Sequence, residues 1–99
     1  MANQKIKRTN RFGGVTYNIV KHIGVVAKYK SGWSKELNIV EWNDGPPKYD
    51  LRDWDTEHEN MGKGLTFVKS EARELARLLE ESFDLEDIDK IPEKIDKMI

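Results

Sequence analysis

The sequence predicts an α+β fold, in which a curved four-stranded antiparallel β-meander is followed by one C-terminal α-helix (ββββα). Two observations predict the sheet. Apolar and polar residues alternate with a period of two from residue 17 onward, and turns that contain glycine or proline interrupt this alternation. A third observation predicts the helix, because apolar residues recur three and four positions apart between residues 70 and 83.

The chain of 99 residues is predicted to form one domain with two flanking segments. Residues 1–16 mix Asn, Lys and Arg around a Gly-Gly pair and are expected to form a flexible basic arm. Residues 17–83 hold the ββββα domain. Residues 84–99 form a C-terminal extension, predicted to be a turn and a short helix broken at Pro92.

The first strand begins at Tyr17 and ends at the Ser31-Gly32 turn. The second runs from about Trp33 to Trp42, with Leu37 and Ile39 on its inner face. Alternation places further apolar residues of the first strand together on one face: Ile19, Ile23, Val25, Ala27 and Tyr29.

The turn at residues 43–47 contains Asp-Gly and two prolines, and it separates the second strand from the third, about Lys48–Trp54. On the third strand, Tyr49 and Leu51 point inward. A polar loop then leads to a short fourth strand at residues 65–68, whose inward residues are Leu65 and Phe67.

The helix is predicted to start at Ser70 as its N-cap, with Glu71 and Glu74 near the first turn, where the helix dipole favours anions. Its apolar stripe is expected to cover the sheet or a partner's helix, and consists of Ala72, Leu75, Ala76, Leu79 and Phe83.

Composition excludes several classes of protein. Without cysteine, the chain forms no disulfide and no thiolate metal site. No apolar run approaches the ~18 residues of a membrane span, and the first residues lack the apolar stretch of a secretory signal. We therefore expect a soluble cytoplasmic protein without membrane partners. Apolar residues are 37% of the chain, which gives a small core for a monomer. Dimerisation would bury additional apolar surface.

Charge is distributed unevenly. Residues 1–63 contain 11 Lys and Arg against 8 Asp and Glu, whereas residues 64–99 contain 6 against 10. This asymmetry is consistent with an anionic partner on the N-terminal part, although it is far from the charge of a dedicated basic binder.

A second sheet face is predicted to stay uncovered and to carry cations and aromatic rings together: Lys28, Lys30, Trp42, Arg52 and Trp54. Lys63 is expected in a loop between two glycines. Trp33 and Lys35 have the opposite parity and join this face only if a bulge near Ser34 re-aims them. Cations for phosphates and rings for unstacked bases are what single-stranded nucleic acid requires.

Simpler interpretations remain open for these residues. An exposed Trp is more often half-buried packing than a base platform. For Arg52, beside Asp50 and Asp53, the alternative is a surface ion pair, which contributes little.

Catalysis finds little support in the sequence. The only histidines are His22 and His58, and residues 57–59 (Glu-His-Glu) resemble a metal site only superficially, because adjacent residues rarely converge on one ion. No glycine-rich phosphate loop or nucleophile elbow is present. We expect no enzyme activity, cofactor, metal or small-molecule substrate.

Two short motifs occur in a fixed order, the strand "DLRDW" and the loop ending "GKGL", and a terminal helix follows them. This segment resembles the transcriptional positive cofactor 4 family of single-stranded DNA-binding coactivators. The upstream segment "GVVAKYKSGWSKELNIVEWNDGPPKYDLRDW" resembles the bacterial YdbC-like branch of that family. The resemblance covers roughly Ile19–Phe83.

The resemblance implies a homodimer with a single-stranded DNA-binding, transcriptional-regulator-like fold and with the helices at the two-fold interface (Leu75, Leu79, Phe83). It implies a nucleoid-associated protein that supports transcription, replication or repair with little sequence preference. By position, DNA-contact roles fall to Arg52, Trp54 and Lys63, and more loosely to Trp42. Chemistry as well as resemblance assigns DNA contacts to Lys28, Lys30, Trp33 and Lys35. A protein-interaction module and a single-stranded RNA binder are the alternatives.

Overall fold

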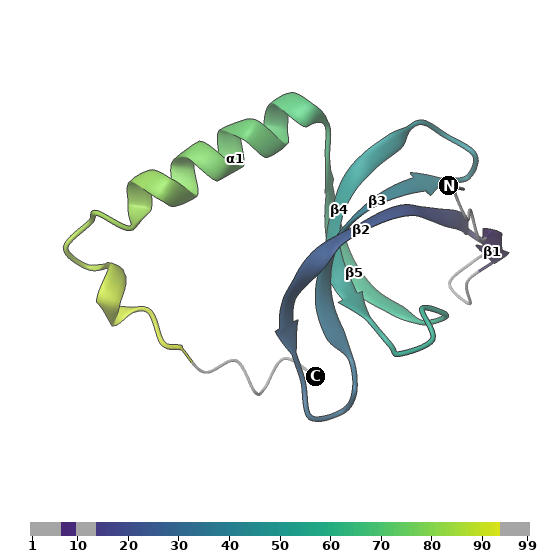
Figure 1. Ribbon diagram of the computed structural model, residues 1–99, viewed down its shortest axis with the longest axis horizontal. Coiled ribbons are helices and arrows are strands. Elements are labelled where there is room, and N and C mark those ends of the chain that lie inside the picture. Colours follow the sequence, from purple (N-terminus) through teal and green to yellow (C-terminus); the bar gives the residue numbers. More distant parts are fainter. Residues whose placement is uncertain (1–6, 10–13, 94–99) are drawn as a thin grey trace.

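The computed structural model describes residues 7–9 and 14–93. An antiparallel sheet with strand order β1-β2-β3-β4-β5 precedes one α-helix and a short 3-10 helix (Figure 1). The elements are β1 (Lys7–Thr9), β2 (Thr16–Lys28), β3 (Ser34–Trp42), β4 (Pro47–Trp54), β5 (Met61–Phe67), α1 (Lys69–Ser82) and η1 (Ile88–Lys90).

The predicted meander of four antiparallel strands followed by one helix is confirmed, in β2 to β5 and α1. The predicted turn between β3 and β4 is present, but positive φ occurs at Asn43 and Asp44, at 53° and 62°, rather than at the Asp44-Gly45 pair. One strand is additional: β1 lies within the range assigned to the basic arm and pairs with the start of β2.

Two predicted boundaries are wrong. The helix begins at Lys69 with Val68 as its N-cap, because the carboxylate of Glu71 accepts the backbone N–H of Val68 at 2.9 Å, so Ser70 is not the cap. Strand β5 begins at Met61, which pairs with Trp54, so Lys63 lies in a strand rather than in a loop. The pairing shifts between Arg52 and Trp54, and this irregularity lets the strand extend through two glycines.

Strand β2 is strongly irregular. Its pairing with β3 shifts three times, at residues 19–21, 22–24 and 25–27, so β2 carries an extra residue at each place. Each bulge bends the strand and increases its twist, and β2 curls over one face of the sheet (Figure 1). The pairing of β3 with β4 has no shift near Ser34. The bulge that would have re-aimed Trp33 is therefore absent there, and Trp33 keeps the parity of Lys35.

The two faces of the sheet exchange the roles that we predicted for them. The face expected to be open is enclosed, because Glu36, Asn38 and Val40 of β3 are buried, while Leu37 and Ile39 are only half-buried. We call the face that carries Glu36, Asn38 and Val40 the enclosed face, and the face that carries Leu37 and Ile39 the outer face. On the enclosed face, the apolar core consists of Tyr17, Val40, Trp54 and Met61, with Ile19 and Trp42 packed against it.

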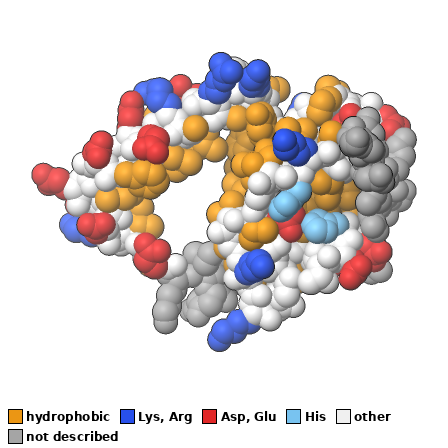
Figure 2. Space-filling model, in the orientation of Figure 1, with side chains coloured by type: hydrophobic (Ala, Val, Ile, Leu, Met, Phe, Trp, Pro, Cys, Tyr) orange, Lys and Arg blue, Asp and Glu red, His pale blue; other side chains and the backbone are white. Residues whose placement is uncertain are grey.

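The outer face is not covered by α1. The helix leaves the sheet at the end of β5 and extends away from it (Figure 1), and none of its residues is buried. Leu79 is 50% exposed and Phe83 61%. Hydrophobic side chains line the side of α1 that faces the sheet, and others lie on the sheet surface opposite (Figure 2). The expectation that this stripe covers the sheet within one chain is therefore wrong.

The C-terminal extension forms a turn and the 3-10 helix η1 before Pro92. No helix in the described part of the chain is long and apolar enough to cross a membrane.

Candidate functional site

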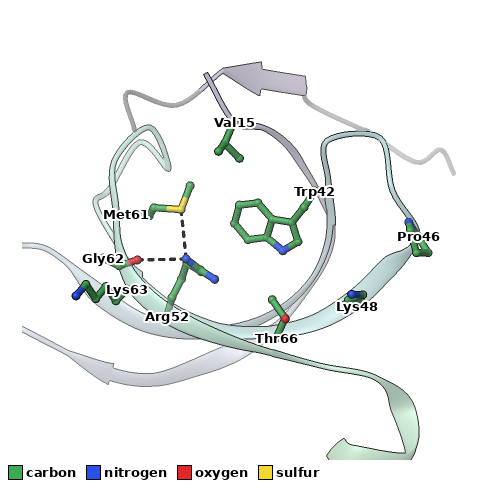
Figure 3. Close-up of a pocket in the computed structure, with 9 residues that line it drawn as sticks. All are labelled: Val15, Trp42, Pro46, Lys48, Arg52, Met61, Gly62, Lys63 and Thr66. Atoms are coloured by element: carbon green, nitrogen blue, oxygen red, sulfur yellow. Dashed lines mark hydrogen bonds between the residues drawn. The ribbon is translucent and has the colours of Figure 1, made fainter. Parts of the chain in front are cut away.

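A cavity of about 680 Å³ opens on the enclosed face, at the end of the sheet where β3 turns into β4 (Figure 3). Trp42 projects into it from β3. We call it the tryptophan cavity, and its lining residues are Val15, Trp42, Pro46, Lys48, Arg52, Met61, Gly62, Lys63 and Thr66. Its walls are mainly apolar, whereas its cations come from two neighbouring strands, β4 and β5.

Arg52 is fixed in place by a buried ion pair. Its Nε lies 2.7 Å from Asp50 Oδ1 and its Nη2 lies 2.8 Å from Asp50 Oδ2, and Asp50 is fully buried. The remaining terminal nitrogen donates to the carbonyl of Gly62 at 3.3 Å. The guanidinium carbon lies 4.6 Å from the centroid of the Trp42 ring, a cation–π contact. Arg52 is therefore in a buried pair rather than the surface pair considered from the sequence.

Gly64 permits this arrangement. A Cβ at this position would lie 2.3 Å from the Cβ of Arg52 and 2.4 Å from the carbonyl oxygen of Leu51. No side chain fits there, so glycine lets β5 approach β4 closely beside Arg52. Gly64 of the "GKGL" motif thus has a packing role in addition to any contact with a ligand.

Three of the predicted site residues meet in the tryptophan cavity, namely Trp42, Arg52 and Lys63. The sequence interpretation missed Lys48, although alternation placed it on the same face as Arg52 and was a sufficient signal. It also missed Val15 and Met61. Their positions depend on the curl of β2 and on the early start of β5, and neither shows in the sequence pattern.

Four predicted residues lie at the other end of the sheet, in or beside the β2–β3 hairpin: Lys28, Lys30, Trp33 and Lys35. None of them lines the tryptophan cavity. Trp42 lies seven positions beyond Lys35 along β3, which is about 23 Å at the rise of a β-strand. Lys28 pairs with Ser34 and has the parity of the enclosed face, whereas Lys35 has the parity of the outer face.

Trp54 is not a base platform. Its side chain is fully buried, with its ring centroid 5.2 Å from that of Tyr17 and 5.4 Å from that of His58. The prediction that Trp54 stacks on a base is therefore wrong. Alternation placed it correctly beside Arg52, but the curl of β2 and the loop at residues 55–60 enclose this part of the face.

A second cavity, of about 340 Å³, contains a polar network around Glu36. Both histidines contact this buried carboxylate: His58 Nε2 lies 2.9 Å from Glu36 Oε1, and His22 Nδ1 lies 3.6 Å from it. Ser34 donates to Glu36 at 2.7 Å and Asn38 at 3.2 Å. The hydroxyl of Tyr17 also donates to the carbonyl of His58, so the network ties the loop to β2 and β3.

The protonation of Glu36 reflects two opposed effects. Burial raises the pKa of Glu36. Hydrogen bonds from His58, Ser34 and Asn38, together with the charge of His58, lower the pKa by more than burial raises it, so the net pKa is below the usual 4.5. A carboxyl group whose pKa is lower in the folded than in the unfolded state stabilises the fold above its unfolded pKa. That contribution is lost as the pH falls through the folded pKa.

We therefore expect Glu36→Gln to weaken the dependence of stability on acid pH. The unfolding free energy of the wild type should fall more steeply than that of the variant between about pH 5 and pH 3, because only the wild type must protonate Glu36. Thermal melts at several pH values measure this. Glu57→Gln, which changes an exposed carboxylate next to His58 in the loop after β4, serves as the control, and equal slopes for wild type and Glu36→Gln would contradict the assignment.

Within residues 7–9 and 14–93, no three His, Asp or Glu side chains are arranged to hold a metal ion. His58 bonds to Glu36, whereas the hydrogen bond of His22 is to Asn38 at 2.7 Å, with Glu36 3.6 Å away.

Comparison with known proteins adds one relative. No family model matches the chain. An uncharacterized protein of Treponema pallidum (strain Nichols) is 38% identical over 63 residues, which make up 64% of this chain and 74% of the relative.

Proposed function

Because the chain belongs to the same family as this uncharacterized Treponema pallidum protein, whose name states no activity, we propose its function from the surface itself. The protein is a non-enzymatic homodimer that binds single-stranded DNA with little sequence preference. It acts at the nucleoid in support of transcription, replication or repair.

The tryptophan cavity is the observation that carries this proposal. An aromatic side chain, Trp42, lies in an apolar hollow whose rim holds Lys48 and Lys63. Neither lysine has an ion-pair partner among the described residues. Unpaired cations next to an aromatic ring provide phosphate attraction and base stacking in one place, which is the chemistry of single-strand binding. The motif resemblance through "DLRDW" and "GKGL" supports the same conclusion.

A double helix suits this surface poorly. Reading a duplex requires a helix or β-ribbon that fits the major groove. The polar side of α1 is rich in Glu, and Arg77 is engaged there by Glu74 and Glu81 at 2.5 and 2.6 Å. This side would repel phosphates, and the other side is apolar.

A second copy of the chain is the partner that we propose for the apolar stripe of α1 and the outer face. Exposed apolar side chains lie on both surfaces, including Leu75, Leu79 and Phe83 on the helix and Leu65 on β5. Patches of this kind mark interfaces in soluble proteins. In a two-fold dimer each copy offers both surfaces, so the same contact is made twice.

The proposal predicts a change in salt dependence for Lys63→Ser. Each phosphate contact contributes about 0.7 to the slope of log affinity against log salt for a single strand. Removing Lys63 should reduce the slope by about 0.7 and weaken binding at low salt. Fluorescence anisotropy of labelled oligo-dT at four salt concentrations measures this.

Lys90→Ser is the matched control, since Lys90 lies on η1 and contacts Asp87, away from the cavity lining. An unchanged slope for Lys63→Ser would remove Lys63 from the interface. If wild-type protein gives no anisotropy change at low salt, single-strand binding itself is refuted.

Two further functions remain distinguishable by experiment. Single-stranded RNA offers the same phosphates and bases, and competition between matched DNA and RNA oligomers decides between them. The exposed stripe of α1 favours a protein-interaction module as the second candidate. Pull-down of a partner protein that persists after Lys48 and Lys63 are both changed to Ser would support it.

A further inference from the structure

The tryptophan cavity is larger and more apolar than phosphate binding requires. Its volume of about 680 Å³ falls in the range of about 300–1,000 Å³ that is typical of small-molecule pockets. Val15, Pro46 and Met61 contribute apolar walls around Trp42. Phosphates bind to cations at the surface and would not fill an apolar cavity of this size. The apolar volume of the cavity therefore needs an explanation other than phosphate binding.

The surroundings of Arg52 indicate what enters the cavity. Its charge is neutralised by the fully buried Asp50 at 2.7 and 2.8 Å, and its plane is held beside Trp42. Transferring Arg52 to a phosphate would leave Asp50 buried and unpaired, which is strongly unfavourable. Arg52 is therefore unsuited to the phosphate role assigned from the sequence. A fixed guanidinium plane and an indole ring instead form a wall suited to a flat heterocycle.

Two lysines flank this wall. Lys48 and Lys63 lie on different sides of the cavity in Figure 3, on β4 and β5. The buried indole N–H of Trp42 also has no hydrogen-bond partner among the described residues, and an unpaired buried donor is costly. A base carbonyl or ring nitrogen would provide the missing acceptor after a small movement of the ring.

We propose that the tryptophan cavity receives one base of the bound strand, turned out of its stack, while Lys48 and Lys63 hold the phosphates on either side of it. This inference rests on the proposed single-strand binding. It makes Trp42 and Arg52 base contacts and restricts phosphate contacts at this site to the lysines. A base in a duplex is paired and cannot enter, so the cavity itself selects unpaired strands.

Oligonucleotides that lack bases test the proposal on the unmodified full chain. Three labelled ten-nucleotide strands are compared at low salt: one fully abasic, one abasic with a single central thymine, and one all thymine. The single-thymine strand should bind roughly 10-fold more tightly than the fully abasic strand, because one base gains the stacked position. The abasic strand should still bind weakly and depend on salt, through its phosphates.

The outcomes separate the two proposals. Equal affinities for the single-thymine and abasic strands would overturn the base site while leaving phosphate-driven binding in place. If none of the three strands binds, the proposed function fails and the base site fails with it.

A filled cavity provides the second test. Thr66 lines the cavity and is exposed, so Thr66→Trp should occupy it without removing a cation. This variant should lose the 10-fold gain from the single thymine and keep the affinity of the wild type for the abasic strand. Thr56→Trp, at an exposed position in the loop after β4, should keep the gain. A folded Thr66→Trp protein that retains the full gain would overturn the proposal, and the wild-type comparison decides the matter if the variant does not fold.

Discussion

Replacing Trp54 with alanine is expected to lower the unfolding free energy by about 3–5 kcal/mol, the usual cost of truncating a large buried aromatic side chain. Trp54 is fully buried in contact with Tyr17 and His58 and pairs with Met61. Among residues 7–9 and 14–93, the core on the enclosed face has only three other buried apolar residues, so little remains to fill the space. Since small domains are stable by about 5–15 kcal/mol, much of the stability should be lost. Urea denaturation followed by far-ultraviolet circular dichroism measures the change.

Trp33→Ala is the matched control, because Trp33 is a half-buried residue of the hairpin. It should cost clearly less than the Trp54 variant. A Trp54→Ala protein within about 1 kcal/mol of the wild type would show that the ring is not a core element. In that case its role as a base platform would have to be reconsidered.

Leu79→Lys is expected to convert the proposed dimer into a monomer. Leu79 is 50% exposed in the single chain, so a lysine there should change the stability of an isolated chain by no more than about 0.5 kcal/mol. In a dimer that buries the stripe of α1, the same lysine would be desolvated without a partner. Sedimentation equilibrium should then give a mass of 11.5 kDa in place of twice that value.

Glu80→Lys introduces the same side chain one position further along α1, in place of a glutamate that is exposed. This control should remain dimeric. A wild-type protein that sediments as a monomer at micromolar concentration, or a Leu79→Lys variant that stays dimeric, would contradict the proposed interface.

Much of the sheet was predictable because alternation is a local property. The periods of β3 and β4 correctly place Trp42, Arg52 and Trp54 on one face. The Asn-Asp-Gly turn was equally clear, since its residues tolerate positive φ.

Which face is enclosed was not predictable from alternation. The enclosed face buries Glu36, Asn38 and Asp50 beside its apolar residues, so its sequence pattern resembles a solvated surface. Burial of these polar groups depends on partners distant in sequence, such as His58 for Glu36. The bulges that curl β2 over this face interrupt the alternation of apolar and polar residues along β2, so the sequence pattern does not reveal the curl.

Part of the site was also predictable, because alternation is a local property. Trp42, Arg52 and Lys63 do share a cavity, and alternation also indicated Lys48. The separation between this cavity and the hairpin lysines, and the burial of the Arg52–Asp50 pair, are tertiary features that spacing alone does not reveal.

Titration of the wild-type protein with oligo-dT, followed by tryptophan fluorescence at several salt concentrations, tests the central claim most directly. Binding at the tryptophan cavity should change the emission of Trp42 in a saturable way. The slope of log affinity against log salt should be about −1.4 or steeper, because Lys48 and Lys63 each contact a phosphate. No change in emission at low salt, or an affinity that does not depend on salt, would contradict single-strand binding at this site.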